Sequence, residues 1–196
     1  LLESILRKVI KLFFSVLLIL ILVNSKSFAK EKWIIDKNIS TINFEVPVLF
    51  AGNVIGEFKK INGFVEIDLQ DKENNKAILS VDIGSVLINY EKYRDLLLSS
   101  VFFDFANFPL GVIDTKKFSY KNENELELNV ELTIKGISRM TKTKLKIKRF
   151  TNEIVQIIGL LSFSRTDFNI GTGNWRNTTI LKDKITIEAN IFLIKD

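Results

Sequence analysis

The sequence ELELNVELTIKG, residues 125–136, decides the fold of this chain. Its apolar residues Leu126, Leu128, Val130 and Leu132 alternate with polar ones, and Ile134 continues the series. A period of two is typical of a β-strand with one apolar face and one solvated face, and ten residues at about 3.3 Å each span about 33 Å. A helix would scatter the same side chains around its circumference. The pattern therefore predicts a long, one-sided strand.

Other segments repeat the pattern, which indicates a long antiparallel sheet. Such a sheet must bury its apolar face, and closing into a barrel is one way to do so. Asn62-Gly63 is typical of a turn between two strands. We predict an all-β protein of eight to nine strands. They are expected at residues 33–36 with 40–50, 54–60, 63–69, 76–83, 110–119, 124–135, 138–149, 154–166 and 184–194.

Residues 89–100 (NYEKYRDLLLSS) break this rhythm, because they show no alternation and have a helical composition. We predict a short helix at about residues 91–98, with Asn89 as its N-cap. Four phenylalanines follow within seven residues, and Pro109 ends that aromatic cluster.

The N-terminal residues have the three-part pattern of a secretory signal peptide. A basic start (residues 7–11) precedes an apolar run of twelve residues (12–23), and Ser27 and Ala29 place small side chains before a cut after Ala29. An uncleaved membrane anchor is the alternative, but twelve residues are fewer than the roughly 20 that span a bilayer. We therefore expect one mature domain at residues 30–196.

Much of the basic charge belongs to this predicted signal peptide. Residues 1–29 contain four cations and one anion, so their removal lowers the formal net charge from +5 to +2. A charge this small gives weak grounds for nucleic-acid binding.

The chain contains neither cysteine nor histidine. An exported domain without disulfides must rest on its apolar core. The missing residue types exclude His-based triads, Cys–His pairs, His-ligated haem, and zinc sites built on His or Cys. They also exclude a lipoprotein with an acylated N-terminal cysteine. We expect no catalytic residue, no metal and no cofactor.

Two further patterns point away from enzyme chemistry. Gly171-Thr-Gly173 lacks the third glycine of a nucleotide-binding fingerprint and does not open a helix after a parallel strand. Carboxylates are abundant, and a pair arranged for glycoside hydrolysis stays an alternative. Most of them, such as Glu125 and Glu127, fall on solvated strand faces, which indicates surface charge.

A lysine ladder occupies one face of the strand at residues 138–149. Lys142, Lys144, Lys146 and Lys148 alternate with other residue types. The pattern predicts a solvated face that resists aggregation. Attraction to anionic lipid headgroups is the alternative.

The phenylalanines of the predicted mature chain are expected to face the barrel interior. Either they fill it or they surround a ligand, since a barrel that its own side chains do not fill holds a greasy molecule. Alternation and aromaticity then predict the wall of such a cavity: Phe44, Val46, Phe58, Leu79, Phe103, Phe105, Leu128, Val130, Leu132, Leu160 and Phe168.

Arg94 and Asp95 lie on the predicted helix beside the aromatic cluster. One interpretation is a polar clamp at the mouth of the cavity, where a few polar groups would orient an apolar ligand. The other is a structural arginine that donates to backbone carbonyls. The sequence leaves both open.

Nine short segments resemble the YceI family in that family's order, and together they cover nearly all of the predicted mature chain. They are WIID (33–36), STINF (40–44), VIGEF (54–58), NGFVEID (62–68), YRDL (93–96), FFD (102–104), FP (108–109), LTIKG (132–136) and RTDFNI (165–170). The resemblance implies a lipocalin-like, eight-stranded antiparallel barrel with a long apolar channel. It also implies polyisoprenoids or related long-chain amphiphiles as ligands, export of many members to the bacterial periplasm, and no known enzymatic activity.

The chain departs from the family pattern at two positions. Family members commonly have histidine where Leu97 stands, so the contact to the ligand's polar end is expected to differ. They commonly have glycine where Asn169 stands, and asparagine tolerates a left-handed backbone better than most residues.

We therefore expect a periplasmic protein that binds a long isoprenoid or fatty-acyl ligand for transport, storage or stress response. Transient contact with a membrane surface and a homodimer are further expectations, and a nucleic-acid partner is not expected. Two alternatives stay open: a protein-interaction module built on a filled barrel, and a carboxylate-dependent hydrolase.

Overall fold

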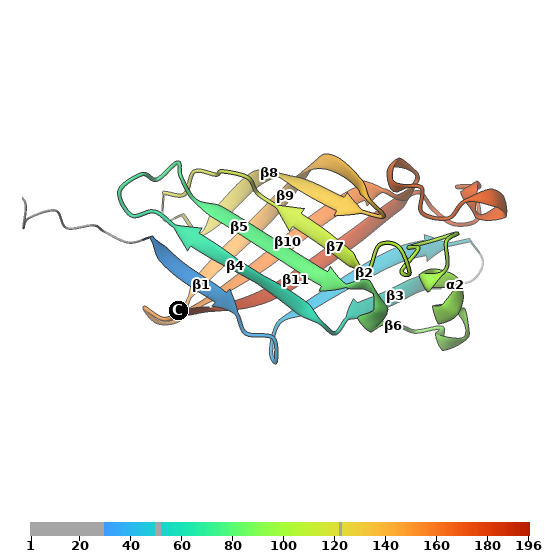
Figure 1. Cartoon of the computed structure of the whole chain (residues 1–196), viewed down its shortest axis with the longest axis horizontal. Helices are drawn as coiled ribbons and strands as arrows, with labels where there is room; N and C mark the ends of the chain where they lie inside the picture. Colours follow the sequence, from blue (N-terminus) through green and yellow to red (C-terminus); the bar gives the residue numbers. More distant parts are fainter. Residues whose placement is uncertain (1–29, 50–51, 122) are drawn as a thin grey trace, which may run out of the picture.

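The sheet closes on itself into a barrel (Figure 1). The computed structural model describes residues 30–49, 52–121 and 123–196. Around the barrel the strands follow the order β1-β4-β5-β7-β8-β9-β10-β11, and a pairing of β1 with β11 completes the circle. The predicted all-β fold, an eight-stranded antiparallel barrel with little helix, is confirmed.

The elements in chain order are β1 (Glu31–Ile35), β2 (Thr41–Val48), β3 (Gly52–Phe58), β4 (Ile61–Ile67), β5 (Lys76–Asp82), η1 (Ile83–Ser85), β6 (Val86–Ile88), η2 (Glu91–Tyr93), α2 (Arg94–Leu98), β7 (Leu110–Asp114), β8 (Glu125–Ile134), β9 (Ile137–Arg149), β10 (Ile154–Ser164), η3 (Arg165–Phe168), η4 (Gly173–Arg176) and β11 (Lys184–Lys195).

Three of the eight wall strands are interrupted. β1 and β2 both pair with β11, so together they form one bent strand. β4 pairs with β1 and β3 pairs with β2, so β3 and β4 form a second bent strand beside the first. β5 and β6 divide in the same way, because β5 pairs with β4 and β6 with β3. No pairing of the described residues joins β6 to β7. The barrel wall is therefore open on that side of one end, where η2 and α2 lie (Figure 1).

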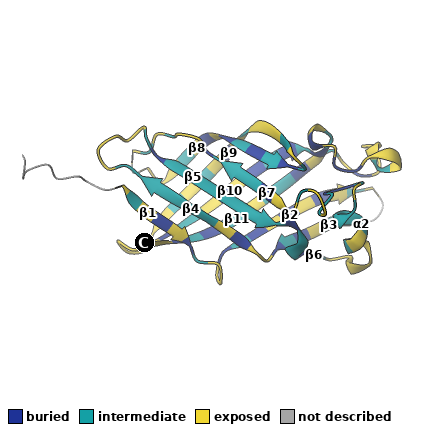
Figure 2. Ribbon diagram, in the orientation of Figure 1, coloured by how far each residue is buried: buried dark blue, intermediate teal, exposed yellow. Residues whose placement is uncertain are grey.

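The alternation of β8 matches its burial. Leu128, Val130 and Leu132 are buried, whereas Glu127 and Asn129 are exposed. Figure 2 shows the same change between buried and exposed positions along the other strands. The period-two pattern thus correctly predicted which face of this strand points inward.

The predicted helix at residues 91–98 is confirmed, but its N-cap is not Asn89. The segment begins as a 3₁₀ turn in η2 and continues as α2, with no side-chain cap bond at either start. Asn89 instead accepts a hydrogen bond from the amide of Ile55 (3.1 Å) and donates to the carbonyl of Asn53 (2.9 Å). Its side chain ties this segment to β3, a tertiary contact that the local pattern could not indicate.

The turn predicted at Asn62-Gly63 is wrong, because both residues lie inside β4. Gly63 pairs with Leu79, and a Cβ at this position would stand 2.3 Å from the carbonyl oxygen of Ile78 and 2.8 Å from the side chain of Ile35. The glycine permits a close approach between strands and does not mark a turn.

The lysine ladder of β9 lies in solvent, as its preferred interpretation predicts. It faces acidic residues of β8, with ion pairs between Lys142 and Glu127 (4.0 Å) and between Lys146 and Glu125 (3.7 Å). Exposed pairs of this kind contribute little to stability.

The predicted signal peptide, residues 1–29, lies outside the described residues. No helix in the described ranges has the length and apolar character needed to cross a membrane.

Candidate functional site: an apolar cavity under a short helix

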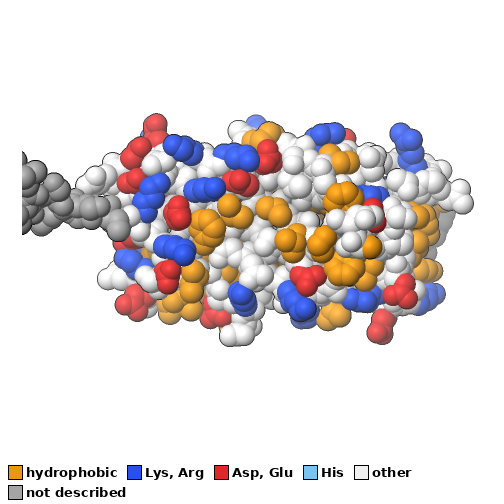
Figure 3. All heavy atoms as spheres, viewed as in Figure 1, with side chains coloured by type: hydrophobic (Ala, Val, Ile, Leu, Met, Phe, Trp, Pro, Cys, Tyr) orange, Lys and Arg blue, Asp and Glu red, His pale blue; other side chains and the backbone are white. Residues whose placement is uncertain are grey.

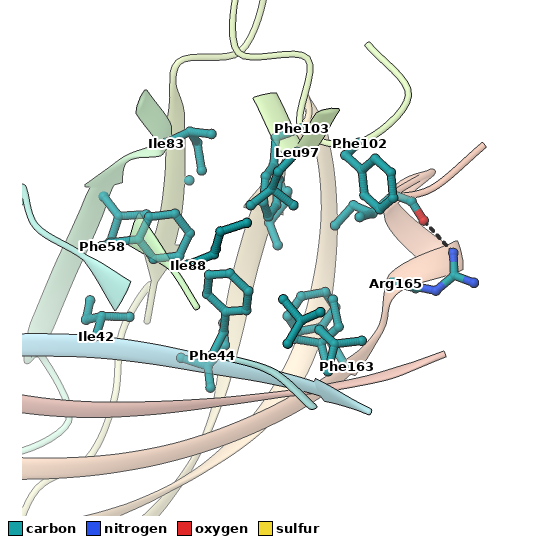
Figure 4. A pocket seen from close by; sticks show the side chains of 18 of the residues that line it. Ile42, Phe44, Phe58, Ile83, Ile88, Leu97, Phe102, Phe103, Phe163 and Arg165 are labelled. Carbon is teal, nitrogen blue, oxygen red and sulfur yellow. Dashed lines mark hydrogen bonds between the residues drawn. The ribbon is translucent and has the colours of Figure 1, made fainter. Parts of the chain in front are cut away.

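A cavity of about 400 Å³, here called cavity 1, lies at the end of the barrel that carries η2 and α2 (Figure 4). Its volume falls in the range of about 300–1,000 Å³ that is usual for ligand pockets. Strands from all sides of the barrel contribute inward-facing apolar side chains, and Leu96 and Leu97 of α2 cover the top. The cavity is therefore built by the fold as a whole.

Aromatic rings form much of its wall. The ring centroids of Phe44 and Phe58 are 5.5 Å apart, and those of Phe58 and Phe103 are 6.3 Å apart. On the far side the rings of Phe102 and Trp175 meet edge to face at 5.6 Å. Tilted and edge-on pairs at these distances are favourable and fix the rings in place. Figure 4 shows the phenylalanines arranged around the cavity.

The polar groups of cavity 1 gather at its lip. Tyr90, Lys92 and Tyr93 come from η2 and the residue before it, and Lys92 Nζ lies 5.0 Å from the centre of the Tyr93 ring. None of the described residues that line cavity 1 is Asp or Glu. The cavity therefore lacks the paired carboxylates that the hydrolase alternative requires at this site.

The one fully buried charge at the cavity is Arg165, whose side chain is 0 % exposed. Its guanidinium donates to the backbone carbonyls of Lys182 (3.1 Å), Ile170 (2.8 Å) and Leu181 (2.9 Å), and more weakly to two others. Burial lowers the pKa of Arg165, and the charge of Asp183 opposes that effect. In Figure 4 the guanidinium points away from the phenylalanine rings. Arg165 therefore holds the loop between β10 and β11 rather than a ligand.

Asp183, the residue just before β11, lies beside Arg165, and the two residues with their hydrogen-bond partners are here called the polar knot. It accepts hydrogen bonds from Ser164, from the Thr166 hydroxyl (2.9 Å) and from the Thr166 amide (3.1 Å). Burial alone would raise the pKa of Asp183, but these bonds and the charge of Arg165 outweigh it, so the pKa is lowered. The knot fixes the segment that carries Trp175 onto the cavity.

Arg94 and Asp95 do not form the predicted polar mouth. Arg94 donates to the carbonyls of Val86 (3.1 Å) and Gly84 (2.6 Å), and neither Arg94 nor Asp95 lines cavity 1 or the second cavity described below. Asp95 is exposed. The structural alternative describes Arg94 correctly, because its helix turns the guanidinium back onto the η1–β6 backbone.

The eleven residues predicted for the cavity wall lie in different parts of the structure. Six of them line cavity 1: Phe44, Val46, Phe58, Leu79, Phe103 and Leu132. Phe105 packs against Gly84, and Phe168 packs edge to face on Phe163 at 5.1 Å without reaching the cavity. Val130 is buried but lines no cavity, and Leu128 lines a second cavity at the other end of the barrel.

The prediction for Leu160 is wrong, because its side chain is 51 % exposed on the outer face of β10. Its neighbour Leu161 points inward. Both faces of this strand are apolar over residues 157–161, so the alternation does not choose between them. The register with β9, in which Leu161 pairs with Thr143, decides the matter.

Several residues that line cavity 1 were missed, among them Ile42, Trp175, Ile187 and Ala189. The alternation of β11 could have identified Ile187 and Ala189. Trp175 lies in a loop without periodicity, and only the folded chain brings it to Phe102.

The two departures from the family pattern have clear positions. Leu97 lines cavity 1, so an apolar side chain stands in the wall at the position where the resemblance implies histidine. Asn169 ends η3 with φ of 52°, a left-handed conformation that asparagine adopts at low cost.

The second cavity, here called cavity 2, measures about 410 Å³. It lies at the end where β1 begins, and Trp33, Phe118 and Leu128 are among its lining residues. Within the described ranges, no group of three or more potential ligand side chains could hold a metal ion.

Comparison with solved structures shows the same fold. Burkholderia cenocepacia BcnA superimposes with a TM-score of 0.73 at 22% identity, covering 81% of this chain and 98% of that chain. A polyisoprenoid-binding domain from Saccharophagus degradans, implicated in plant cell wall breakdown, gives 0.66 at 14% identity, covering 84% and 98%. The Campylobacter jejuni YCEI protein gives 0.60 at 22% identity, covering 76% and 88%.

No curated protein matches this chain. A family model, by contrast, matches most of its length: the YceI-like domain, over residues 33–193. This match spans every strand from within β1 to within β11, and with it the whole barrel that encloses both cavities. The chain therefore belongs to the YceI-like family.

Proposed function

We propose that the protein is a periplasmic binding protein that holds one long isoprenoid or acyl chain in cavity 1, for transport, storage or stress response. The YceI-like family and the polyisoprenoid-binding domain among its structural neighbours support an isoprenoid-type ligand. The signal-peptide pattern of residues 1–29 supports export.

The observation that carries this proposal is the unfilled, almost wholly apolar interior of cavity 1. Leu79, Val81 and Ile187 point into the barrel yet keep part of their surface accessible, because no side chain occupies the space between them. Each methylene of a ligand buried there contributes roughly 0.8 kcal/mol. A long chain can thus bind well with few specific contacts.

The lip of cavity 1 suits a ligand with a polar end. Lys92 and Tyr93 offer a cation and a hydroxyl beside the opening, and Leu97 replaces the histidine common in the family. We expect the headgroup to lie at Lys92, outside the aromatic wall.

The same end of the barrel carries exposed apolar side chains next to lining residues. Leu49, Ile55, Leu87 and Ile180 are exposed, and each follows or precedes a residue that lines cavity 1. They support transient contact with a membrane surface during ligand loading. Flotation with anionic vesicles checks this: Leu87→Glu should weaken the association, and Met140→Glu, on the outer face of β9, should not. The homodimer stays a prediction for sedimentation velocity.

Native mass spectrometry of the chain isolated from its own host tests the main proposal. A discrete added mass with an isoprenoid or acyl fragmentation pattern is expected. Ala189→Leu extends a side chain into cavity 1 and should lower the fraction of protein that carries the added mass. Glu188→Gln, on the exposed face of the same strand, should leave that fraction unchanged. An apo mass, together with failure to take up any long-chain probe, would favour the interaction module.

A further inference from the structure

Buried residues stand between cavity 2 and cavity 1 on several strands of the barrel. Along β8, Val130 lies between Leu128, which lines cavity 2, and Leu132, which lines cavity 1. The same arrangement recurs on β10 and β11, whereas on β5 Ala77 borders cavity 2 and the next inward residue, Leu79, borders cavity 1. The buried residues between the cavities, here called the septum, are Ile35, Ile61, Val130, Leu161 and Ile191, all at most 7 % exposed and none in contact with either cavity.

The interior of cavity 2 is apolar and aromatic. Trp33, Phe118, Leu126, Val155 and Ile157 line it, and Leu193 continues its wall toward Ile191 of the septum. Its volume of about 410 Å³ lies within the usual range of about 300–1,000 Å³ for ligand pockets. Hydrocarbon could fill this space in the way proposed for cavity 1.

The mouth of cavity 2 differs from that of cavity 1, because it carries five charged residues. Two are acidic and already have partners: Glu31 pairs with Lys195 (2.5 Å), and Asp68 pairs with Lys30 (3.9 Å) and accepts the amides of Gln70 and Asp71 (3.0 Å each).

The other three charges at this mouth are cations: Lys72, Lys121 and Arg149. None takes part in an ion pair of the described residues, and Arg149 lies over the Trp33 ring at 5.6 Å. Figure 3 shows charged side chains crowded at this end of the barrel. The mouth therefore presents positive charge that the protein itself does not neutralise.

Buried hydrogen bonds fix the backbone beside two of these cations, Lys72 and Lys121. Asn75 is fully buried, and its side chain donates to the carbonyls of Lys72 (2.7 Å) and Phe118 (3.0 Å) and accepts the amide of Asp68 (2.9 Å). The amide of Tyr120 donates to the carbonyl of Lys72 (3.0 Å). The loop at residues 68–75 and the segment at 115–121 are thereby joined at the mouth, which is a built rim.

We propose that cavity 2 is a second binding site, which takes a single-chain anionic amphiphile such as a fatty carboxylate. The hydrocarbon lies between Trp33 and Phe118, and the anionic headgroup lies at the rim among Lys72, Lys121 and Arg149. This site goes beyond the proposed function, since it needs neither cavity 1 nor an isoprenoid.

The two tryptophans of the chain allow each cavity to be monitored alone, because Trp33 lines cavity 2 and Trp175 lines cavity 1. In Trp175→Phe, titration with ω-bromododecanoate should quench Trp33 fluorescence saturably, since bromine quenches on contact. The neutral ω-bromododecanol should bind about fivefold more weakly. Absence of saturable quenching, or equal affinity for the two probes, overturns the proposal.

Rim variants in the Trp175→Phe background test the cations. Lys121→Gln leaves the contact between Arg149 and Trp33 intact and should weaken the carboxylate probe about threefold, and Lys121→Gln with Arg149→Gln about tenfold. Lys144→Gln, an exposed lysine on the outer face of β9, should leave it unchanged. Unchanged affinity in the double variant, with thermal unfolding showing a folded protein, contradicts the assignment of the rim.

Stoichiometry distinguishes two sites from one continuous channel. Native mass spectrometry of the wild-type chain with excess ω-bromododecanoate should show a second adduct if cavity 1 also accepts the probe, and one adduct that quenches only Trp33 if it does not. A single adduct whose bromine quenches Trp175, and whose binding weakens in the rim variants, would mean one chain that crosses the septum and would overturn the separate site. Loss of Trp175 quenching alone bears on cavity 1 and the proposed function.

Discussion

The ring of Phe44 lies directly over Gly56, its cross-strand partner in the β2–β3 pair. A Cβ at Gly56 would stand 2.2 Å from Cζ of that ring and 3.0 Å from the side chain of Ile88. Because Gly56 has no side chain, the Phe44 ring can pack flat against the barrel wall at this position. The ring therefore stays out of the middle of cavity 1.

Gly56→Ala should push the Phe44 ring into cavity 1. Overpacking of this kind costs about 1–3 kcal/mol, so both the free energy of unfolding and the capacity for a long-chain ligand should fall. Denaturant titration and uptake of a fluorescent acyl probe measure the two effects.

The double variant Gly56→Ala with Phe44→Leu is the control for this prediction, because the smaller side chain makes room for the added methyl group. It should recover probe uptake relative to Gly56→Ala. If Gly56→Ala binds as the wild type does, the ring does not limit the cavity.

Val130→Glu should unfold the protein or abolish ligand retention, whereas Asn129→Glu should be tolerated. Val130 is 1 % exposed within the septum and Asn129 is exposed on the same strand. An unpaired carboxylate in this apolar layer costs about 3 kcal/mol or more. Thermal unfolding and native mass spectrometry of both variants check it, and equal effects at the two positions would contradict the orientation of β8.

Arg165→Lys should destabilise the protein by about 3 kcal/mol or more, even though the charge is kept. One ammonium group cannot reach the several carbonyls that the planar guanidinium satisfies, and buried carbonyls left without donors are costly. Chemical denaturation measures the loss. Arg176→Lys in the exposed η4 is the matched control, and a similar small effect in both would argue against the knot.

Acid should destabilise the protein in part through Asp183. The pKa of Asp183 is lowered in the folded state relative to about 3.9 for an unfolded aspartate. A lowered carboxyl pKa stabilises the fold above the unfolded value, and this stabilisation disappears as the pH falls through the folded pKa. Stability should therefore be steady near pH 7 and fall below about pH 4.

Asp183→Asn isolates this contribution. Its thermal midpoint should be lower than that of the wild type at pH 7. The difference should shrink as the pH falls below about 4, because the unfolded aspartate then binds a proton that the folded carboxylate, with its lowered pKa, takes up only at lower pH. Asp68 and Asp114, whose pKa values are also lowered, remain in the variant, so the difference belongs to Asp183. Asp167→Asn, exposed in η3 next to Thr166, is the control, and a constant gap across this pH range would contradict the assignment.

Sequence pattern predicted the wall of cavity 1 well where only one face of a strand is apolar. Phe44, Val46 and Leu132 lie on such strands and line the cavity as predicted. The pattern did not choose between Leu160 and Leu161, because both neighbours are apolar and only the register with β9 turns one of them inward.

The polar residues were the least predictable part. Arg94 and Arg165 look alike in sequence, as arginines beside aromatic residues, and both spend their donors on backbone carbonyls that come from other segments. Which carbonyls these arginines reach depends on how the loops fold, and loops have no sequence periodicity from which this could be predicted.

The sequence by itself determined a sheet that has to be closed or covered. Alternation along β8 and its neighbours leaves an apolar face that only a closed or covered sheet can bury, and that requirement acts along each strand separately. Tertiary structure alone decided that this interior holds two cavities. Val130 is packed on all sides, whereas Leu132, two residues further along the same strand, borders cavity 1. The difference depends on how far side chains from the opposite wall reach, and no single strand contains that information.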